Sequence, residues 1–171
     1  MKRGSIEYQK LLTAGLQQTA PLMLNLREGE TADQVCQDML DIMEGPLCMR
    51  RVPHVTFTPN DIESVHAASL ASAILEGVTG SSPPEKALLY FHGFDGYPQP
   101  HKDVIYDIAM DRKINGVVLP EGWRIAFSVD NLVRFNAHEE GSLDTYCLES
   151  VTVIDPAFLN KLFLMALGGP A

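Results

Sequence analysis

Residues 87–129 decide the fold of this chain, and they read ALLYFHGFDGYPQPHKDVIYDIAMDRKINGVVLPEGWRIAFSV. The first five residues are apolar without interruption, as expected of a strand that is covered on both faces of a sheet. A glycine-rich turn follows, then a helical pattern over residues 102–112, a turn at Asn115-Gly116 and a second buried strand over residues 123–129. A strand, a helix and a second strand in this order predict parallel pairing, with the helix on one face of the sheet.

The rest of the chain repeats this alternation of strands and helices. Further strands are expected over residues 21–26, 52–57 and 147–154. Thr31 and Gln34 have the spacing of a capping box, and Thr58-Pro59 is typical of a helix start. We therefore predict one domain over residues 1–171, a three-layer α/β/α fold with a mainly parallel five-stranded sheet and no separate helical lid. The helix expected after Thr58-Pro59 buries Ile62, Val65, Leu70, Ile74 and Leu75, and a last amphipathic helix is expected after Asp155-Pro156.

Composition and charge exclude several classes of function. The 171 residues are 46% hydrophobic and 20% charged, which is typical of a globular protein. A formal net charge of −9 disfavours binding to nucleic acid or to an anionic membrane, since both need clustered cations. The three cysteines form no metal-binding pair, and no stretch reads as a signal peptide or a membrane span. We expect a cytoplasmic protein with reduced thiols.

Residues 26–33 read LREGETAD and follow the first expected strand, where some α/β proteins bind phosphate. The order of elements and the segment LPEGWRI at residues 119–125 resemble the P-loop ATPase core of the MoxR-type AAA+ group. That resemblance implies a phosphate-binding loop of the form GxxxxGK[ST]. Without gaps, Ala32 occupies the lysine position and Asp33 the hydroxyl position, while Leu26 and Thr31 replace the two glycines.

Charge in this segment also opposes a nucleotide. Glu28, Glu30 and Asp33 would face the phosphates, with only Arg27 to oppose them. Each close contact between like charges costs on the order of a few kcal/mol near a protein surface before salt screening. Tight binding of ATP is therefore not expected.

The resemblance implies an Asp-Glu pair at the end of the third strand, where His92 and Gly93 stand instead. Glycine has no side chain to act as a base, and a neutral histidine is a poor ligand for Mg²⁺. Asp130 or Asn131 matches the polar residue that senses the terminal phosphate in the family. The degenerate nucleotide site implied in this way comprises Gly29, Thr31, Ala32, Asp33, His92, Gly93, Asp130 and Asn131.

These replacements favour a catalytically inactive AAA+-like domain without cofactor or metal. Its expected role is that of a protein-interaction, scaffold or regulatory module. An active AAA+ ATPase or a second copy of the chain is the expected partner. A structural or assembly protein of a larger particle stays open as an alternative.

A small hydrolase, esterase-like or metal-dependent, is a second alternative. The segment FHGFDG at residues 91–96 resembles the oxyanion segment of α/β-hydrolases, and His92, Asp95 and His101 are its candidate functional residues. The later serines lack the flanking glycines of a nucleophile elbow; they are Ser128, Ser142 and Ser150. His138-Glu139-Glu140 forms another cluster of possible metal ligands, but neither cluster has a recognised metal-binding spacing.

Overall fold

The computed structural model describes residues 6–25, 29–45, 51–79, 84–129 and 152–154. A parallel sheet forms the centre, and its strands lie in the order β2 (His54–Phe57), β3 (Lys86–Phe91), β6 (Gly122–Val129) and β1 (Leu22–Asn25). The short segment β7 (Thr152–Ile154) pairs in parallel with β1 on the far side. The predicted α/β fold with a parallel sheet is therefore confirmed. Of the strand expected over residues 147–154, only the last three residues lie within the described part of the chain.

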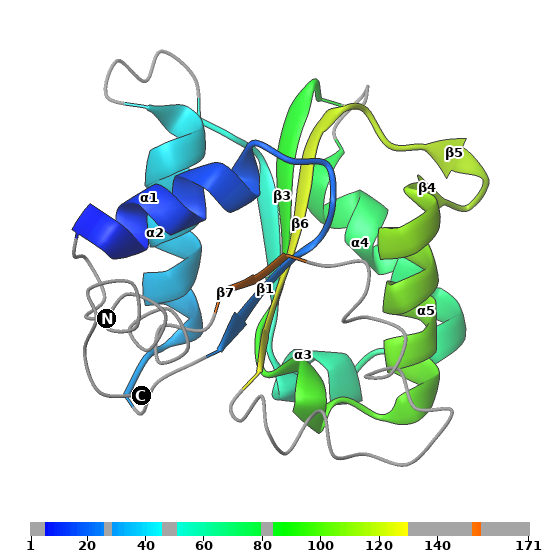
Figure 1. Ribbon diagram of the computed structural model, residues 1–171. Coiled ribbons are helices and arrows are strands. Elements are labelled where there is room, and N and C mark those ends of the chain that lie inside the picture. Colours follow the sequence, from blue (N-terminus) through cyan, green and yellow to red (C-terminus); the bar gives the residue numbers. More distant parts are fainter. Residues whose placement is uncertain (1–5, 26–28, 46–50, 80–83, 130–151, 155–171) are drawn as a thin grey trace.

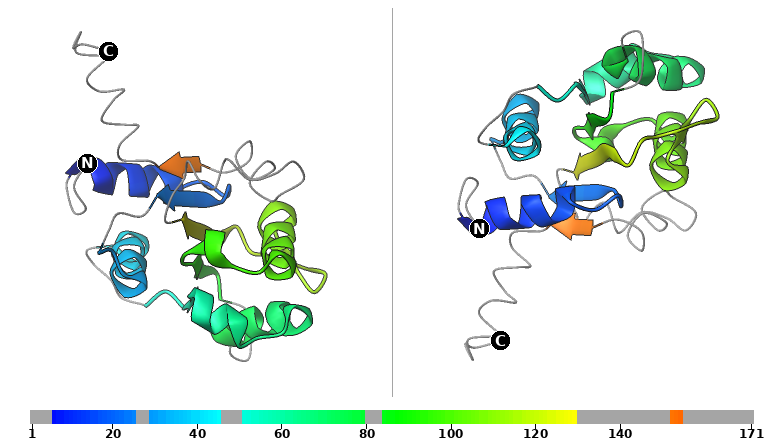
Figure 2. Two further views of the ribbon diagram at one scale, coloured as in Figure 1. Left: turned by 90° about the horizontal axis from the view of Figure 1, so that it is seen from below. Right: turned by 90° about the horizontal axis from the view of Figure 1, so that it is seen from above.

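Helices cover both faces of the sheet, as Figure 1 shows. On one face lie α1 (Ile6–Leu16) and α2 (Ala32–Glu44), and on the other lie α3 (Pro59–Glu63), α4 (Leu70–Val78) and α5 (Gln99–Asp111). The views from below and above show the same division into three layers (Figure 2). Each face has its own apolar cluster, one centred on Leu12, Leu24 and Met39 and the other on Phe91, Trp123 and Phe127.

Local signals in the sequence set the starts of two helices. Thr31 caps α2, and its side chain accepts the amide of Gln34 while the Gln34 side chain accepts the amide of Thr31. Thr58 and Asp61 make the same reciprocal pair at the start of α3. Each pair satisfies amides that a helix start would otherwise leave without a partner.

The single helix expected after Thr58 is divided into three parts. After α3, a 3₁₀ turn, η1 (Ala67–Ser69), precedes α4. The hydroxyl of Ser64 donates to the carbonyl of Asp61, and Nδ1 of His66 accepts the amide of Ala68. Such side-chain bonds to the nearby backbone compete with helical bonds and end the helix.

Between α5 and β6 the chain makes a two-stranded hairpin, β4 (Lys113–Ile114) and β5 (Val117–Val118). Asn115 and Gly116 both have positive φ at its turn, as an Asn-Gly pair readily adopts. Val117 and Val118 are exposed at its tip, at 57% and 65%. Within the described residues, no helix is both long and apolar enough to cross a membrane.

Arg112 holds the end of α5 to the edge of the sheet where the strands begin. Its guanidinium donates to the carbonyl oxygens of Thr19 at 3.0 Å, Pro120 at 2.9 Å and Trp123 at 3.0 Å. Burial lowers the pKa of Arg112, and the positive charge of Arg124 lowers it further. One side chain thus connects the segments that enter β1 and β6 with the end of α5.

We expect Arg112→Ala to lower the free energy of unfolding by about 2 kcal/mol, because three carbonyl groups lose a charged donor. For a domain of this size, the melting temperature would fall by roughly 4–8 °C. Urea denaturation measures the effect. The control is Lys113→Ala, at an exposed neighbouring position, which is expected to change stability by less than about 0.5 kcal/mol. Equal losses in both variants would contradict the role given to Arg112.

Candidate functional site

The candidate site lies at the edge of the sheet where the parallel strands end. Ligands of open α/β sheets bind at this edge. Here β1 leads into the turn before α2, β3 leads into His92 and Gly93, and β6 ends at Val129. The site residues at positions 29, 31–33, 92 and 93 are therefore gathered at one edge. Asp130 and Asn131, which follow β6, lie outside the described residues.

The start of α2 is capped by its own chain. Gly29 has a φ of 85°, and Thr31 then takes the N-cap position. The amides of Thr31 and Gln34 are bound to each other's side chains, each at 3.3 Å. Ala32 and Asp33 form the first helical positions, where a phosphate-binding loop needs a lysine and a hydroxyl.

A buried hydrogen-bond network closes the end of β3 and β6. The phenol of Tyr90 donates to Oγ of Ser128 at 2.8 Å, and the amide of Gly93 donates to the same oxygen at 3.2 Å. Nδ1 of His92 lies 2.8 Å from the Tyr90 hydroxyl and 3.3 Å from Oγ of Ser128. If Nδ1 carries a proton, it can donate to the Tyr90 hydroxyl, which donates in turn to Ser128, and all three side chains then have partners.

Electrostatics at this network disfavour negative charge. Burial raises the pKa of Tyr90 well above its usual range, the nearby Cys36 and Glu30 raise it further, and the bond to Ser128 opposes them. Burial also raises the pKa of the Cys36 thiol, and the carboxylate of Asp33 adds to that shift. Glu30, before α2, and Asp33, in its first turn, therefore act on the same space as the network. An incoming phosphate would meet the same repulsion.

Aromatic rings fix the chain beyond His92 from the opposite face of the sheet. The ring of Phe91 stacks on Phe57 and Phe127, with centroids 5.8 and 5.7 Å apart, and Phe94 packs on Phe127 at 4.9 Å. Phe94 lies in a short 3₁₀ turn, η2 (Phe94–Gly96), and is fully buried. The hydroxyl of Tyr97 donates to the carbonyl of Phe57 at 2.8 Å. The loop after β3 is thus packed into the core.

Backbone amides of this loop are used within the protein. The amide of His92 donates to Phe57 O at 2.8 Å, and that of Gly96 donates to Gly93 O at 2.9 Å. The amide of Gly93 is bound to Ser128. An oxyanion hole needs amides that point at a substrate, so these three cannot form one in this conformation.

The histidines and acids that suggested a metal site do not gather around a metal. Nε2 of His101 lies 2.6 Å from the carbonyl of Val65, and its Nδ1 is buried without a hydrogen-bond partner. His101 therefore ties α5 to the segment after α3. Among the described residues, no group of three or more metal-ligating side chains could hold an ion. The cluster at residues 138–140 lies outside the described residues.

Sequence reasoning missed the contact between Tyr90 and Ser128, and it considered Ser128 only as a possible nucleophile. The alternation of side chains along a strand could have indicated part of this contact. Because successive side chains point to opposite faces, Tyr90 and His92 must share one face of the sheet, in a strand that is otherwise apolar. The partner Ser128 follows only from the register that sets Phe91 opposite Phe127. That register was not available from the sequence.

Comparison with solved structures identifies the fold. The chain superposes on the RuvB Holliday junction branch migration motor of Thermotoga maritima with a TM-score of 0.55 at 10% identity, over 88% of this chain and 45% of RuvB. It superposes on the P-loop NTPase domain of the sigma-54 transport activator from E. coli with a TM-score of 0.51 at 11% identity, over 88% and 93% of the two chains. The fold is that of an AAA+-like P-loop NTPase domain.

The likeness shows the fold alone at these identities. No protein-family model matches the sequence, and no curated protein matches it either. The chain spans about half the length of the RuvB chains that it resembles. Chemistry in this P-loop-like domain has to be argued from its own residues.

Gly93 tests whether the edge requires a left-handed backbone conformation after β3. Its φ of 66° is unfavourable for any residue with a side chain, and an added Cβ would lie 3.2 Å from Cγ of Pro59. We expect Gly93→Ala to cost about 1–2 kcal/mol of stability in urea denaturation.

Gly96→Ala is the matched control in the same turn. Its φ is not positive, and an added Cβ would come no closer than 3.9 Å to Pro59. We expect its stability to be unchanged or raised by up to about 1 kcal/mol. If Gly93→Ala were as stable as Gly96→Ala, the left-handed turn at Gly93 would not be a constraint on this edge.

Proposed function

We propose that this P-loop-like domain is catalytically inactive and acts as a protein-interaction, scaffold or regulatory module. The observation that carries the proposal is the composition of its phosphate-facing edge. Ala32 and Asp33 open α2 where a lysine and a hydroxyl are needed, and His92 and Gly93 follow β3 where two acids are needed. The residues that would bind phosphate and the acids that would bind Mg²⁺ and activate water are therefore replaced together.

The geometry of the edge supports this proposal. A phosphate site needs free amides at a helix start, whereas the Thr31–Gln34 capping box already binds two of them. A magnesium site needs hard oxygen ligands, whereas Nδ1 of His92 faces Tyr90 and Ser128. In this proposal the protein's own side chains satisfy the polar groups that would otherwise bind a ligand.

We propose a protein partner, either an active AAA+ ATPase or a second copy of this chain. Protein binding suits a domain that keeps an ATPase framework and has lost its chemistry. A cytoplasmic setting is part of the proposal and fits the buried free thiol of Cys36.

Sedimentation equilibrium of the purified chain separates the possible partners. One defined higher-order species would support self-association or assembly of a particle. A strictly monomeric chain would contradict self-association and would favour a different protein, such as an active AAA+ ATPase, as the partner.

Nucleotide binding gives the direct test. With a Kd of 50 µM, 5 mM MgATP would stabilise the fold by about 2.7 kcal/mol. The melting temperature would then rise by roughly 5–10 °C. We expect a shift below about 1 °C, no heat of binding in calorimetry and no release of phosphate. Saturable binding at micromolar ATP would contradict the proposal, as would turnover that is abolished by Asp130→Ala or Asn131→Ala.

A hydrolase is the second candidate, because the contact between Ser128 and His92 has the composition of a serine–base pair. Its environment argues against a nucleophile. Ser128 is 0% exposed, and its oxygen already accepts hydrogen bonds from Tyr90 and Gly93. An attacking oxygen needs access to a substrate carbonyl.

We expect no labelling of Ser128 by a fluorophosphonate and no esterase activity on p-nitrophenyl acetate above the level of the His92→Ala variant. Mass spectrometry of the treated protein measures the first, and absorbance the second. Stoichiometric labelling that is absent in Ser128→Ala would favour the hydrolase. A general denaturation control, the same reagent with protein in urea, shows whether labelling follows unfolding.

A further inference from the structure

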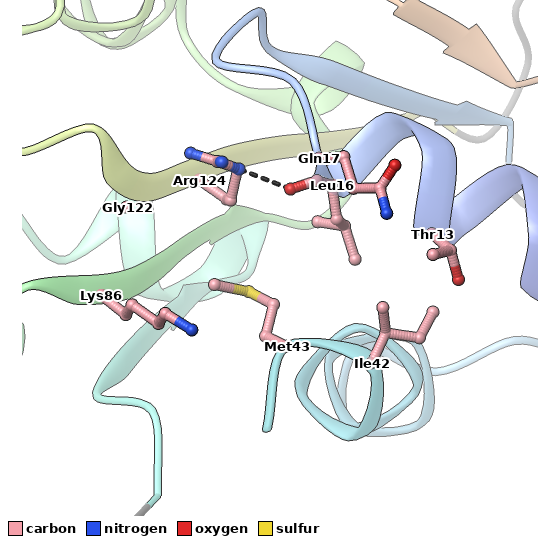
Figure 3. Close-up of a pocket in the computed structure, with 8 residues that line it drawn as sticks. All are labelled: Thr13, Leu16, Gln17, Ile42, Met43, Lys86, Gly122 and Arg124. Atoms are coloured by element: carbon pink, nitrogen blue, oxygen red, sulfur yellow. Dashed lines mark hydrogen bonds between the residues drawn. The ribbon is translucent and has the colours of Figure 1, made fainter. Parts of the chain in front are cut away.

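A hollow of about 300 Å³ lies at the opposite edge of the sheet, where β3 and β6 begin. Two helices form its walls, with Thr13 and Leu16 from α1, Gln17 directly after α1, and Ile42 and Met43 from α2 (Figure 3). This volume is at the lower end of the range for small-molecule sites. The hollow is separate from the candidate site at the other ends of the strands.

Two cations stand at the hollow, and they differ in what they can bind. Arg124 donates from Nε to the carbonyl of Leu16 and from Nη1 to the carbonyls of Glu121 and Trp123. Its charge therefore offsets the partial negative charge at the end of α1. Lys86 is exposed, and among the described residues no acid or carbonyl is bonded to its ammonium. Figure 3 shows this ammonium directed toward Met43.

Charges of both signs act at this edge. Burial lowers the pKa of Arg112, the charge of Arg124 lowers it further, and the charge of Glu121 raises it. The carboxylate of Glu44, at the end of α2, is bound to the amide of Val52 at 3.0 Å. In a chain with a net charge of −9, an ammonium with no bonded partner among the described residues favours an anionic ligand at this hollow.

We propose that this hollow binds a small carboxylic acid with an apolar body. The carboxylate pairs with the ammonium of Lys86, and the apolar body packs against Leu16, Ile42 and Met43. Gln17 supplies an amide beside this wall, whereas the Thr13 hydroxyl donates to the carbonyl of Gln9. This inference goes beyond the proposed function and does not depend on it, because the hollow shares no residue with the nucleotide edge.

Methyl NMR on protein labelled at methionine tests the proposal. The signal of Met43, assigned with Met43→Leu, is followed while hexanoate, hexanol or hexylammonium is added to the full chain. We expect saturable shifts with hexanoate, binding at least about tenfold weaker with hexanol, and none with hexylammonium. A tenfold change corresponds to about 1.4 kcal/mol. No shift with hexanoate, or equal binding of hexanol, would overturn the proposal.

Variants assign the effect to Lys86. Lys86→Glu and Lys86→Gln change an exposed position and are expected to keep the fold while weakening hexanoate at least about tenfold. Lys113→Glu makes the same charge change at an exposed position outside the hollow, and we expect wild-type binding. Equal weakening by Lys86→Glu and Lys113→Glu would show a general charge effect and overturn the site.

A short peptide distinguishes two sources of the carboxylate, a free small acid and the C-terminus of a polypeptide. Acetyl-Leu-Leu carries a free carboxylate, and its amide does not. Tighter binding of the acid than of hexanoate, with no binding of the amide, would assign the carboxylate to the end of a polypeptide. Tighter binding of hexanoate would assign it to a free acid. Both results support the chemistry proposed for Lys86.

Discussion

The pairing of β6 with both β3 and β1 sets the whole candidate site. Its register places Phe91 opposite Phe127, so that the next residues along the two strands, His92 and Ser128, stand beside each other. On one face the register lets Tyr90 reach Ser128, and on the other it stacks Phe91 on Phe127. A slip of one residue would exchange the two faces and bury the polar groups among the rings. The polar network and the aromatic stack therefore specify one register together.

That register gives the described part of this edge a closed hydrogen-bond network. In a nucleotide-binding domain, free amides and charged side chains at this edge have their partners in the nucleotide. In this chain Ser128, Tyr90, Gly93 and His92 bind one another. A fully satisfied buried network is rigid, whereas a partly satisfied one is costly. The described part of this edge therefore contributes to stability.

The sequence predicted the features that depend on neighbours along the chain. The capping box of Thr31 and Gln34, the Asn115-Gly116 turn and the buried strands at Phe91 and Phe127 follow from local composition and period. The break after α3 was not predicted, because a side chain such as His66 can cap a turn or remain in a helix at similar cost. The site was harder to predict: Tyr90 carried a signal in its alternation, but its partner is set by strand pairing across 38 positions.

The place of β1 in the sheet has a consequence for how the protein is made. Leu22 pairs with Ala126 on one side and with Thr152 on the other, so β1 finds no partner among the strands that directly follow it in the chain. A ribosome adds roughly 5–20 residues per second, and distant pairings form late. For several seconds after Leu22 and Leu24 emerge, the two backbone edges of β1 have neither of these strand partners, although α1 and α2 can already cover the side chains of Leu22 and Leu24. Among the described strands, the pairing of β1 is therefore completed last during synthesis.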